Sequence, residues 1–197
     1  MTEKIQIPNM LLAGSTGRNS GKTYFCCSLI RKFTLKETII AVKITTVREE
    51  GCSCIRENRV HCGACTSFSG NFSLLEETNR EGGKDTQLML EAGAYKVYWL
   101  RAREKYLAEG IKNLMENIKG NELIICESNS IGAIVKPGLF LMFHDKYAKV
   151  IKESAEKVMP DADRLVIKDN NSFNLNMEAV RIINGEWILE DDASYVD

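Results

Sequence analysis

The sequence lacks any long apolar run and any excess of charge of one sign. No uninterrupted apolar stretch approaches the roughly 20 residues that a membrane-spanning helix needs. The opening segment, MTEKIQIPNMLLAG, carries charge and a proline before a short apolar run. Lys and Arg number 26 against 27 Asp and Glu, and the basic residues are not gathered into a run. We therefore expect a cytoplasmic protein whose partners include neither a membrane nor a nucleic acid.

The composition is that of a globular protein with a core. The chain has 197 residues, of which 44% are hydrophobic and 27% are charged. It shows no internal repeat or low-complexity segment. Residues 47–83 show no clear helix or strand pattern over a length far beyond the median loop of about 4–6 residues. We expect one domain over residues 1–197, with a metal-binding insertion at about 47–83 for the reasons given below.

Short apolar segments alternate with segments of helical periodicity. The strands we expect cover residues 9–14, 38–44, 96–100, 121–126, 138–143 and 163–168, with one more short strand within 184–197. The helices we expect cover residues 22–33, 85–93, 103–118, 147–158 and 174–183. These strands are too apolar to alternate in polarity, as is typical of strands covered on both faces. The order predicts an α/β fold with a mostly parallel open sheet and helices on both faces.

A glycine-rich segment, GSTGRNSGKTYF, directly follows the first expected strand. It matches the end of the phosphate-loop pattern G-x-x-x-x-G-K-[ST] at Gly21, Lys22 and Thr23, whereas Thr16 occupies the first glycine position. Loop N–H groups and the helix N-terminus attract phosphates, Lys22 adds a positive charge, and the Thr23 hydroxyl can ligate Mg²⁺. This context predicts the P-loop NTPase fold; the alternative is a glycine-rich turn with a chance G-K-T. The residues expected to bind the nucleotide here are Gly17, Arg18, Asn19, Ser20, Gly21, Lys22, Thr23 and Tyr24.

Two charged residues follow apolar strands at the edge where ligands bind in open α/β sheets. Glu127 is the first acid after the apolar run LIIC, and Lys43 lies near the end of the second strand. We expect Glu127 to assist Thr23 in holding Mg²⁺, the alternative being a surface acid that caps a helix. Lys43 could reach a phosphate or could be a solvated lysine.

Four segments in order, GRNSGKT, IIAVKITT, GGKDTQLMLEAGAYKV and LIICESNS, resemble the molybdopterin-guanine dinucleotide biosynthesis protein B family. More broadly, they are similar to the class of ATPases and GTPases that includes nitrogenase iron protein, dethiobiotin synthetase and metallocluster maturation ATPases. The resemblance implies a homodimer and places Lys84, Asp85 and Thr86 on the nucleotide or Mg²⁺ side. It also implies a turn at Gly93 and Ala94. Asp85 could equally be a plain N-cap of the following helix. The expected catalytic residues are Lys22, Lys43, Asp85 and Glu127.

Four of the seven cysteines lie close together in the insertion. Their spacing is C-x-C, seven residues, then C-x-x-C, formed by Cys52, Cys54, Cys62 and Cys65. Four thiolates suit tetrahedral Zn²⁺ and suit an iron–sulfur cluster equally well. The resemblance to metallocluster ATPases favours a [4Fe–4S] cluster, with zinc as the alternative. The remaining cysteines, Cys26, Cys27 and Cys126, are expected to be small buried residues.

These motifs predict a Mg²⁺-dependent nucleoside triphosphatase that couples nucleotide turnover to electron transfer or to maturation of a metalloenzyme or redox partner. ATP is preferred to GTP because the chain has no N-K-x-D motif. Asp169 and Asn170, near the last long strand, are candidates for base contact. The alternatives are a GTP-binding adaptor of molybdenum cofactor biosynthesis, a nucleotide-binding regulator, and a small-molecule kinase with a zinc loop. The kinase would close Arg80, Arg101 or Arg103 over the transferred phosphate.

Overall fold

An eight-stranded mixed sheet forms the centre of the protein in a computed structural model that describes residues 3–47 and 68–190. The strand order is β3-β4-β2-β5-β1-β6-β7-β8. The six inner strands are parallel, and β3 and β8 pair antiparallel at the two edges. The strands are β1 Ile5–Ser15, β2 Ile39–Val47, β3 Phe72–Glu76, β4 Lys96–Arg103, β5 Leu123–Glu127, β6 Val135–Asp145, β7 Arg164–Asp169 and β8 Ser172–Phe173. The expected α/β fold with a mostly parallel sheet is confirmed.

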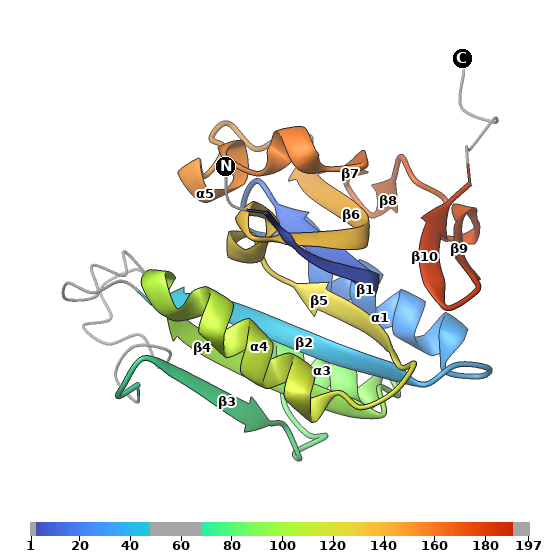
Figure 1. Cartoon of the computed structure of the whole chain (residues 1–197). Helices are drawn as coiled ribbons and strands as arrows, with labels where there is room; N and C mark the ends of the chain where they lie inside the picture. Colours follow the sequence, from blue (N-terminus) through green and yellow to red (C-terminus); the bar gives the residue numbers. More distant parts are fainter. Residues whose placement is uncertain (1–2, 48–67, 191–197) are drawn as a thin grey trace.

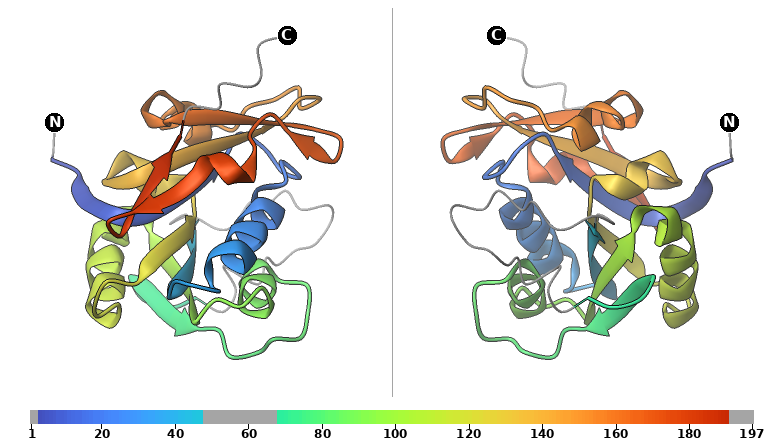
Figure 2. Two further views of the ribbon diagram at one scale, coloured as in Figure 1. Left: turned by 90° about the vertical axis from the view of Figure 1, so that its right-hand side faces the viewer. Right: turned by 90° about the vertical axis from the view of Figure 1, so that its left-hand side faces the viewer.

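Helices cover both faces of the sheet (Figures 1 and 2). On one face lie α1 Lys22–Phe33 and α3 Asp85–Glu91, and the hairpin of β9 Val180–Ile183 and β10 Glu186–Leu189 packs against the same core. The other face is covered by α4 Leu107–Asn117 and the short α5 Glu153–Glu156. Four 3-10 turns complete the described chain: η1 Glu104–Tyr106, η2 Ser130–Ala133, η3 Met159–Asp161 and η4 Met177–Ala179. In the described ranges, no helix has the length and apolar character needed to cross a bilayer.

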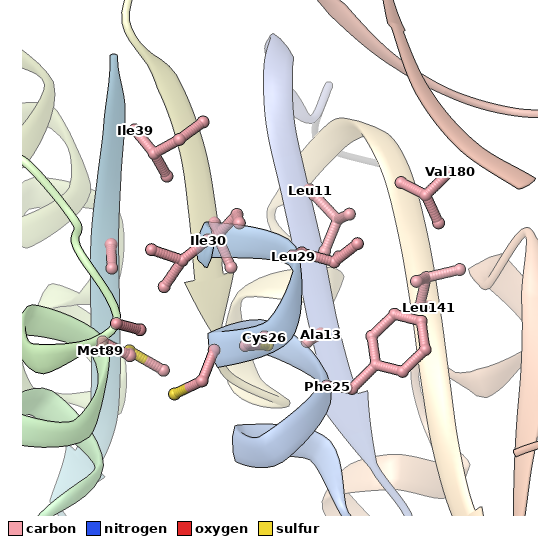
Figure 3. Packing of buried hydrophobic residues seen from close by; sticks show 14 of the residues in the cluster. Leu11, Ala13, Phe25, Cys26, Leu29, Ile30, Ile39, Met89, Leu141 and Val180 are labelled. Atoms are coloured by element: carbon pink, nitrogen blue, oxygen red, sulfur yellow. The ribbon is translucent and has the colours of Figure 1, made fainter. Parts of the chain in front are cut away.

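The central strands are held by apolar packing on both sides. All five residues of β5 are buried, which agrees with the apolar sequence LIIC and with its place between β1 and β2. Figure 3 shows α1 against the sheet, with Phe25, Leu29 and Ile30 packed among side chains of the strands. Cys26, Cys27 and Cys126 are buried free thiols, as expected. Burial is the main reason that the pKa of Cys27 rises to about 11.

The strand register aligns the residues that follow the apolar segments. Glu127 is paired in register with Ala13 of β1 on one side and with Lys43 of β2 on the other. The carboxyl ends of parallel strands lie at one edge of a sheet, so the end of β1, the end of β5 and Lys43 meet there. Strands β1, β5 and β2 therefore form the edge of the sheet at which the sequence predicts a ligand site.

Two of the expected helices are wrong in whole or in part. Residues 174–183 were expected to be helical, but they form η4 and then strand β9. The reason is the following Asn-Gly pair: Asn184 and Gly185 have φ values of 55° and 78°, the left-handed dihedrals of a tight hairpin turn between β9 and β10. Residues 147–158 are helical only over α5, because the backbone at Lys152 is extended and its N–H bonds to Thr16 O at 2.9 Å.

Part of the expected insertion belongs to the sheet. Strand β3 lies within residues 47–83 and pairs antiparallel with β4, with Phe72 opposite Ala102. At the other end of the insertion, Val47 of β2 is paired with Arg103 of β4. Val47, at the start of the insertion, and Phe72 of β3, within it, are therefore both paired with the carboxyl end of β4.

Candidate functional site

The segment between β1 and α1 forms one wall of a cleft of about 930 Å³. Strand β1 ends at Ser15 and α1 begins at Lys22, so the phosphate-loop pattern lies in the strand–loop–helix setting that it requires. The structure brings all of the expected nucleotide-binding residues of this segment to the cleft: Gly17, Arg18, Asn19, Ser20, Gly21, Lys22, Thr23 and Tyr24. The cleft is within the size range of small-molecule sites in proteins.

The loop conformation explains which glycine of the pattern is needed. Gly21 has φ 77°, and a Cβ atom there would lie 2.6 Å from Cζ of Phe173, so both the backbone and the space require glycine. Thr16, which stands where the pattern has glycine, does not have a positive φ. It is fully buried, its N–H bonds to Phe143 O at 2.9 Å, and its hydroxyl lies 2.7 Å from Nδ1 of His144. A threonine therefore serves at this position by fastening the loop to β6.

Glu127 is the centre of a cluster of charged side chains. Its side chain is only 3% exposed, and its Oε1 lies 2.8 Å from Nζ of Lys22 and 2.8 Å from Nζ of Lys43. Lys43 forms a second ion pair with Asp85. Three ion pairs thus link the four expected catalytic residues, Lys22, Lys43, Asp85 and Glu127. Glu127 is buried rather than a surface acid, and Lys43 is paired rather than solvated.

The two carboxylates turn one oxygen towards the lysines and the other towards Thr23. The Thr23 hydroxyl oxygen lies 3.1 Å from Oε2 of Glu127 and 3.3 Å from Oδ1 of Asp85. A hydroxyl has one hydrogen and can donate to only one of these oxygens at a time. The Thr23 hydroxyl thus lies beside two carboxylates, and hydroxyl and carboxylate oxygens are the kind of donors that Mg²⁺ prefers. The structure therefore brings the expected Mg²⁺ ligands Thr23 and Glu127 together, with Asp85 beside them.

Asp85 lies in the first turn of α3 rather than before the helix, so the simple N-cap interpretation is wrong. Of its neighbours, Thr86 donates to Oε2 of Glu77 at 2.8 Å and, with Lys84, is outside the described lining of the cleft. Gly93, with φ 105°, and Ala94 form the turn between α3 and β4. Of the three residues that the resemblance places on the nucleotide side, the structure therefore brings only Asp85 to the described lining of the cleft.

The pKa values of the cluster show which charges dominate. Burial, the largest single influence, raises the pKa of Glu127, but the charges and hydrogen bonds of Lys22 and Lys43 together outweigh it and hold the pKa below its usual range. For Lys43, burial acts to lower the pKa, and the charges and hydrogen bonds of Glu127 and Asp85 outweigh it, so the pKa is raised. Glu127 and Lys43 are therefore both charged at neutral pH.

These shifts give a pH dependence of stability. A carboxyl whose pKa is lowered on folding stabilises the protein above its unfolded pKa, and this contribution is lost as the pH falls through the folded pKa. We expect Glu127→Gln to unfold more easily than wild type at pH 7, because Lys22 and Lys43 lose their shared partner. The difference should shrink as the pH falls below the ordinary carboxyl pKa of 4.5 and through the folded pKa of Glu127, because protonated glutamate resembles glutamine.

Urea unfolding of both proteins between pH 7 and the acid limit of the fold measures this difference. Glu116→Gln, at an exposed position of α4, is the matched control and should follow the wild-type curve. A Glu127→Gln penalty that stays constant across the acid range would contradict the expectation.

The cleft is locally positive although the chain has a formal net charge of −1. Two of its basic residues, Lys152 and Lys168, were not among the expected site residues. Lys168 Nζ donates to Asn19 O at 2.8 Å and so supports the loop from β7. Its position after an apolar strand is the same signal that pointed to Lys43. The basic residues lining the cleft are Arg18, Lys22, Lys43, Lys152 and Lys168, against the acids Asp85 and Glu127.

The two residues expected to contact the base differ in position. Asn170 lines the cleft, beside Asn171 and Phe173. Asp169 is not part of the described lining, and its carboxylate accepts from Lys146 Nζ at 2.6 Å and from Tyr147 OH at 2.9 Å. The structure therefore brings only Asn170 of this pair to the cleft.

The arginines expected for a kinase lie elsewhere. Arg80 donates to Leu90 O at 3.1 Å, and Arg103 donates to Gly70 O at 3.0 Å. Arg101 is buried, with its guanidinium 4.8 Å from the ring centroid of Trp99. Within the described residues, none of the three arginines lines the cleft.

The expected metal ligands Cys52, Cys54, Cys62 and Cys65 lie outside the described residues. Among the residues that are described, no group of three or more His, Cys, Asp or Glu side chains is arranged to hold a metal ion. The oxygen set at Thr23 has only two such residues, so it would need phosphate oxygens or water to complete the coordination of Mg²⁺.

Comparisons of the chain with models of known protein families, with curated proteins and with solved structures found no significant match. The resemblance described above therefore rests on its motif residues.

Proposed function

We propose that the protein is a Mg²⁺-dependent nucleoside triphosphatase of the P-loop NTPase fold that prefers ATP to GTP. The observation that carries the proposal is the position of Glu127. This one buried carboxylate contacts Lys22 and Thr23 of the phosphate-loop pattern and also Lys43 of the neighbouring strand. A chance G-K-T in a turn gives no reason for a buried acid to gather these three groups.

The ion pairs of the cluster define what the residues do when nucleotide binds. Lys22 and Lys43 neutralise Glu127 and Asp85, and the phosphates of a nucleotide offer the same lysines more negative charge. We infer that both lysines exchange a carboxylate for a phosphate oxygen. Thr23, Glu127 and Asp85 would then hold Mg²⁺, which neutralises charge that develops on the transferred phosphoryl group. Lys22 and Lys43 would bind and orient the phosphates, with Lys168 supporting the loop at Asn19.

The preference for ATP is supported by the side chains near β7. Guanine presents two adjacent N–H donors to its site, which a free carboxylate would accept. Asp169, the only acid among the two base candidates, already accepts from Lys146 and Tyr147. Asn170, which lines the cleft, carries both a donor and an acceptor, as recognition of adenine requires.

The four-cysteine segment supports a more specific function, in which the protein carries a [4Fe–4S] cluster. Turnover would be coupled to electron transfer or to maturation of a metalloenzyme partner, with a homodimer implied by the resemblance. Support comes from the start of the insertion. Strand β2 carries Lys43 of the cleft and ends at Val47, where the insertion begins, so one strand connects the cleft with the cysteine segment. The GTP-binding adaptor of molybdenum cofactor biosynthesis and a kinase with a zinc loop are the alternatives. No observation favours the kinase, since its arginines lie outside the described lining of the cleft.

The proposal is tested by competition binding and phosphate release with ATP and GTP, each with Mg²⁺ and with EDTA. We expect ATP to bind more tightly than GTP and phosphate release to require Mg²⁺. Tight binding without release in the presence of a reductant would favour a nucleotide-binding regulator. Phosphate transfer to added small acceptors, with little release to water, would favour the kinase. Failure to bind either nucleotide would overturn the proposal.

A further inference from the structure

The side chain of Asn129 pairs with the backbone of Ser15, the last residue of β1. Ser15 N–H donates to Oδ1 of Asn129 at 2.7 Å, and Nδ2 of Asn129 donates to Ser15 O at 2.7 Å. Just before this pair, Ser128 N–H donates to Ala13 O at 3.1 Å. The amide of Asn129 therefore continues the hydrogen-bonding between β5 and β1 past the point where β5 ends. A carboxamide can do this because it carries a donor and an acceptor side by side.

Ser15 in turn holds the phosphate loop together. Its hydroxyl accepts from Ser20 Oγ at 2.9 Å and from Gly17 N–H at 3.2 Å, and it also contacts Gly17 O. Ser15 and Ser20 are 2% and 3% exposed, so little water competes for these bonds. The start and the end of the loop are thus tied to each other through one hydroxyl group.

The same loop is held from the opposite side of β1 by Thr16, whose N–H bonds to Phe143 O of β6. Asn129 supplies the hold on the β5 side, two residues after Glu127. Glu127, which faces Lys22, is the last residue of β5, and Asn129, which holds the loop, follows two residues later. The end of β5 therefore positions both the carboxylate and the loop that carries Lys22. Removing the Asn129 amide would leave a buried backbone N–H and C=O without these partners.

We propose that Asn129 is a positioning residue that sets the shape of the phosphate loop and its alignment with Glu127. The inference rests on the proposed function in so far as the loop binds the phosphates of a nucleotide. Asn129 acts through Ser15 and does not itself line the described part of the cleft. The Asn129 side chain thus adds two hydrogen bonds that hold the loop at Ser15, beyond what the glycine pattern provides.

The test uses Asn129→Ala and Asn129→Asp in the full chain. Asn129→Asp keeps the acceptor for Ser15 N–H but faces Ser15 O with a carboxylate oxygen, so we expect it to be at least as harmful as alanine. In both variants, Mg²⁺-ATP affinity should fall about tenfold, and the amides of residues 15–23 should exchange hydrogen faster than in wild type. Asn117→Ala, which removes an exposed hydrogen bond to Asn113 O on α4, is the matched control and should change neither quantity.

Denaturant unfolding of the same proteins separates positioning from general destabilisation. We expect the loss of ATP affinity to exceed what the shift in global stability of Asn129→Ala explains, because the protein stays folded under the binding conditions. If wild type binds ATP and the Asn129 variants bind it equally well, the inference is overturned. If wild type binds no nucleotide, the proposed function fails, and hydrogen exchange still decides the matter. Loop exchange unchanged in both variants would then overturn the inference, and faster exchange confined to the loop would support it.

Discussion

Replacing Lys22 by alanine is expected to lower kcat/KM for Mg²⁺-ATP by about 100-fold or more, because it removes the loop cation that would face the phosphates. The expected effect on folding is smaller. Glu127 keeps Lys43 at 2.8 Å and its contact with Thr23, so its buried charge remains paired when Lys22 is lost. Activity and stability should therefore respond very differently to this one change.

Phosphate release and fluorescent-nucleotide binding measure the effect on the site, and urea unfolding measures the effect on the fold. Lys112→Ala, at an exposed position of α4 on the opposite face of the sheet, is the matched control and should retain wild-type activity. Glu127→Ala provides a contrast, because it leaves both Lys22 and Lys43 without their shared partner and should destabilise the fold as well. Wild-type turnover in Lys22→Ala would show that the cleft at the phosphate loop is not the site of hydrolysis.

The part of the site that the sequence predicts is the part set by strand order. Glu127 follows the apolar residues of β5, and Lys43 interrupts those of β2. Because parallel strands end at a common edge of the sheet, the sequence predicts that both residues lie near Lys22. The exact limits of α1 follow from the Gly21 that precedes it and the apolar spacing within it. The local sequence pattern and the strand topology point to the same edge of the sheet, so the sequence is sufficient to predict Lys22, Lys43 and Glu127 there.

Asn129, Lys168 and Phe173 could not be placed in the same way. Each contacts the loop through a long-range pair: Asn129 with Ser15, Lys168 with Asn19, and Phe173 with the space above Gly21. A carboxamide or lysine after a strand has many possible partners, and only the packed structure selects one. The misassigned helix at 174–183 has a local cause instead, since the turn-forming Asn184 and Gly185 were present in the sequence.

The position of Asp169 is also a matter of tertiary contacts. The sequence places Asp169 and Asn170 equally well for base contact, and the structure separates them because Lys146 and Tyr147 hold the Asp169 carboxylate. Asn170 comes after the end of β7 and has a left-handed backbone, with φ 54°, so its side chain leaves the chain in another direction than that of Asp169.

Protein prepared without oxygen is expected to be coloured and to contain about four iron and four sulfide per chain, held by Cys52, Cys54, Cys62 and Cys65. The spacing of these cysteines would allow four thiolates to bind one cluster, and the buried thiols are poor alternatives. Burial raises the pKa of Cys27 to about 11 and raises the pKa values of Cys26 and Cys126, so these three remain protonated at neutral pH.

Iron, sulfide and zinc analysis with a visible absorption spectrum distinguishes the possible metals. The double variant Cys62→Ser/Cys65→Ser should lose the iron and the colour entirely, whereas Cys27→Ala, the control, should retain both. A colourless wild-type protein with one zinc and no sulfide would replace the redox function with a structural zinc loop and leave the ATPase proposal intact. Retention of iron in the double variant would instead show that the metal is bound elsewhere. Coupling is then tested by adding Mg²⁺-ATP to the reduced protein, because a cluster that responds to the nucleotide should change its rate of oxidation in wild type and not in Lys22→Ala.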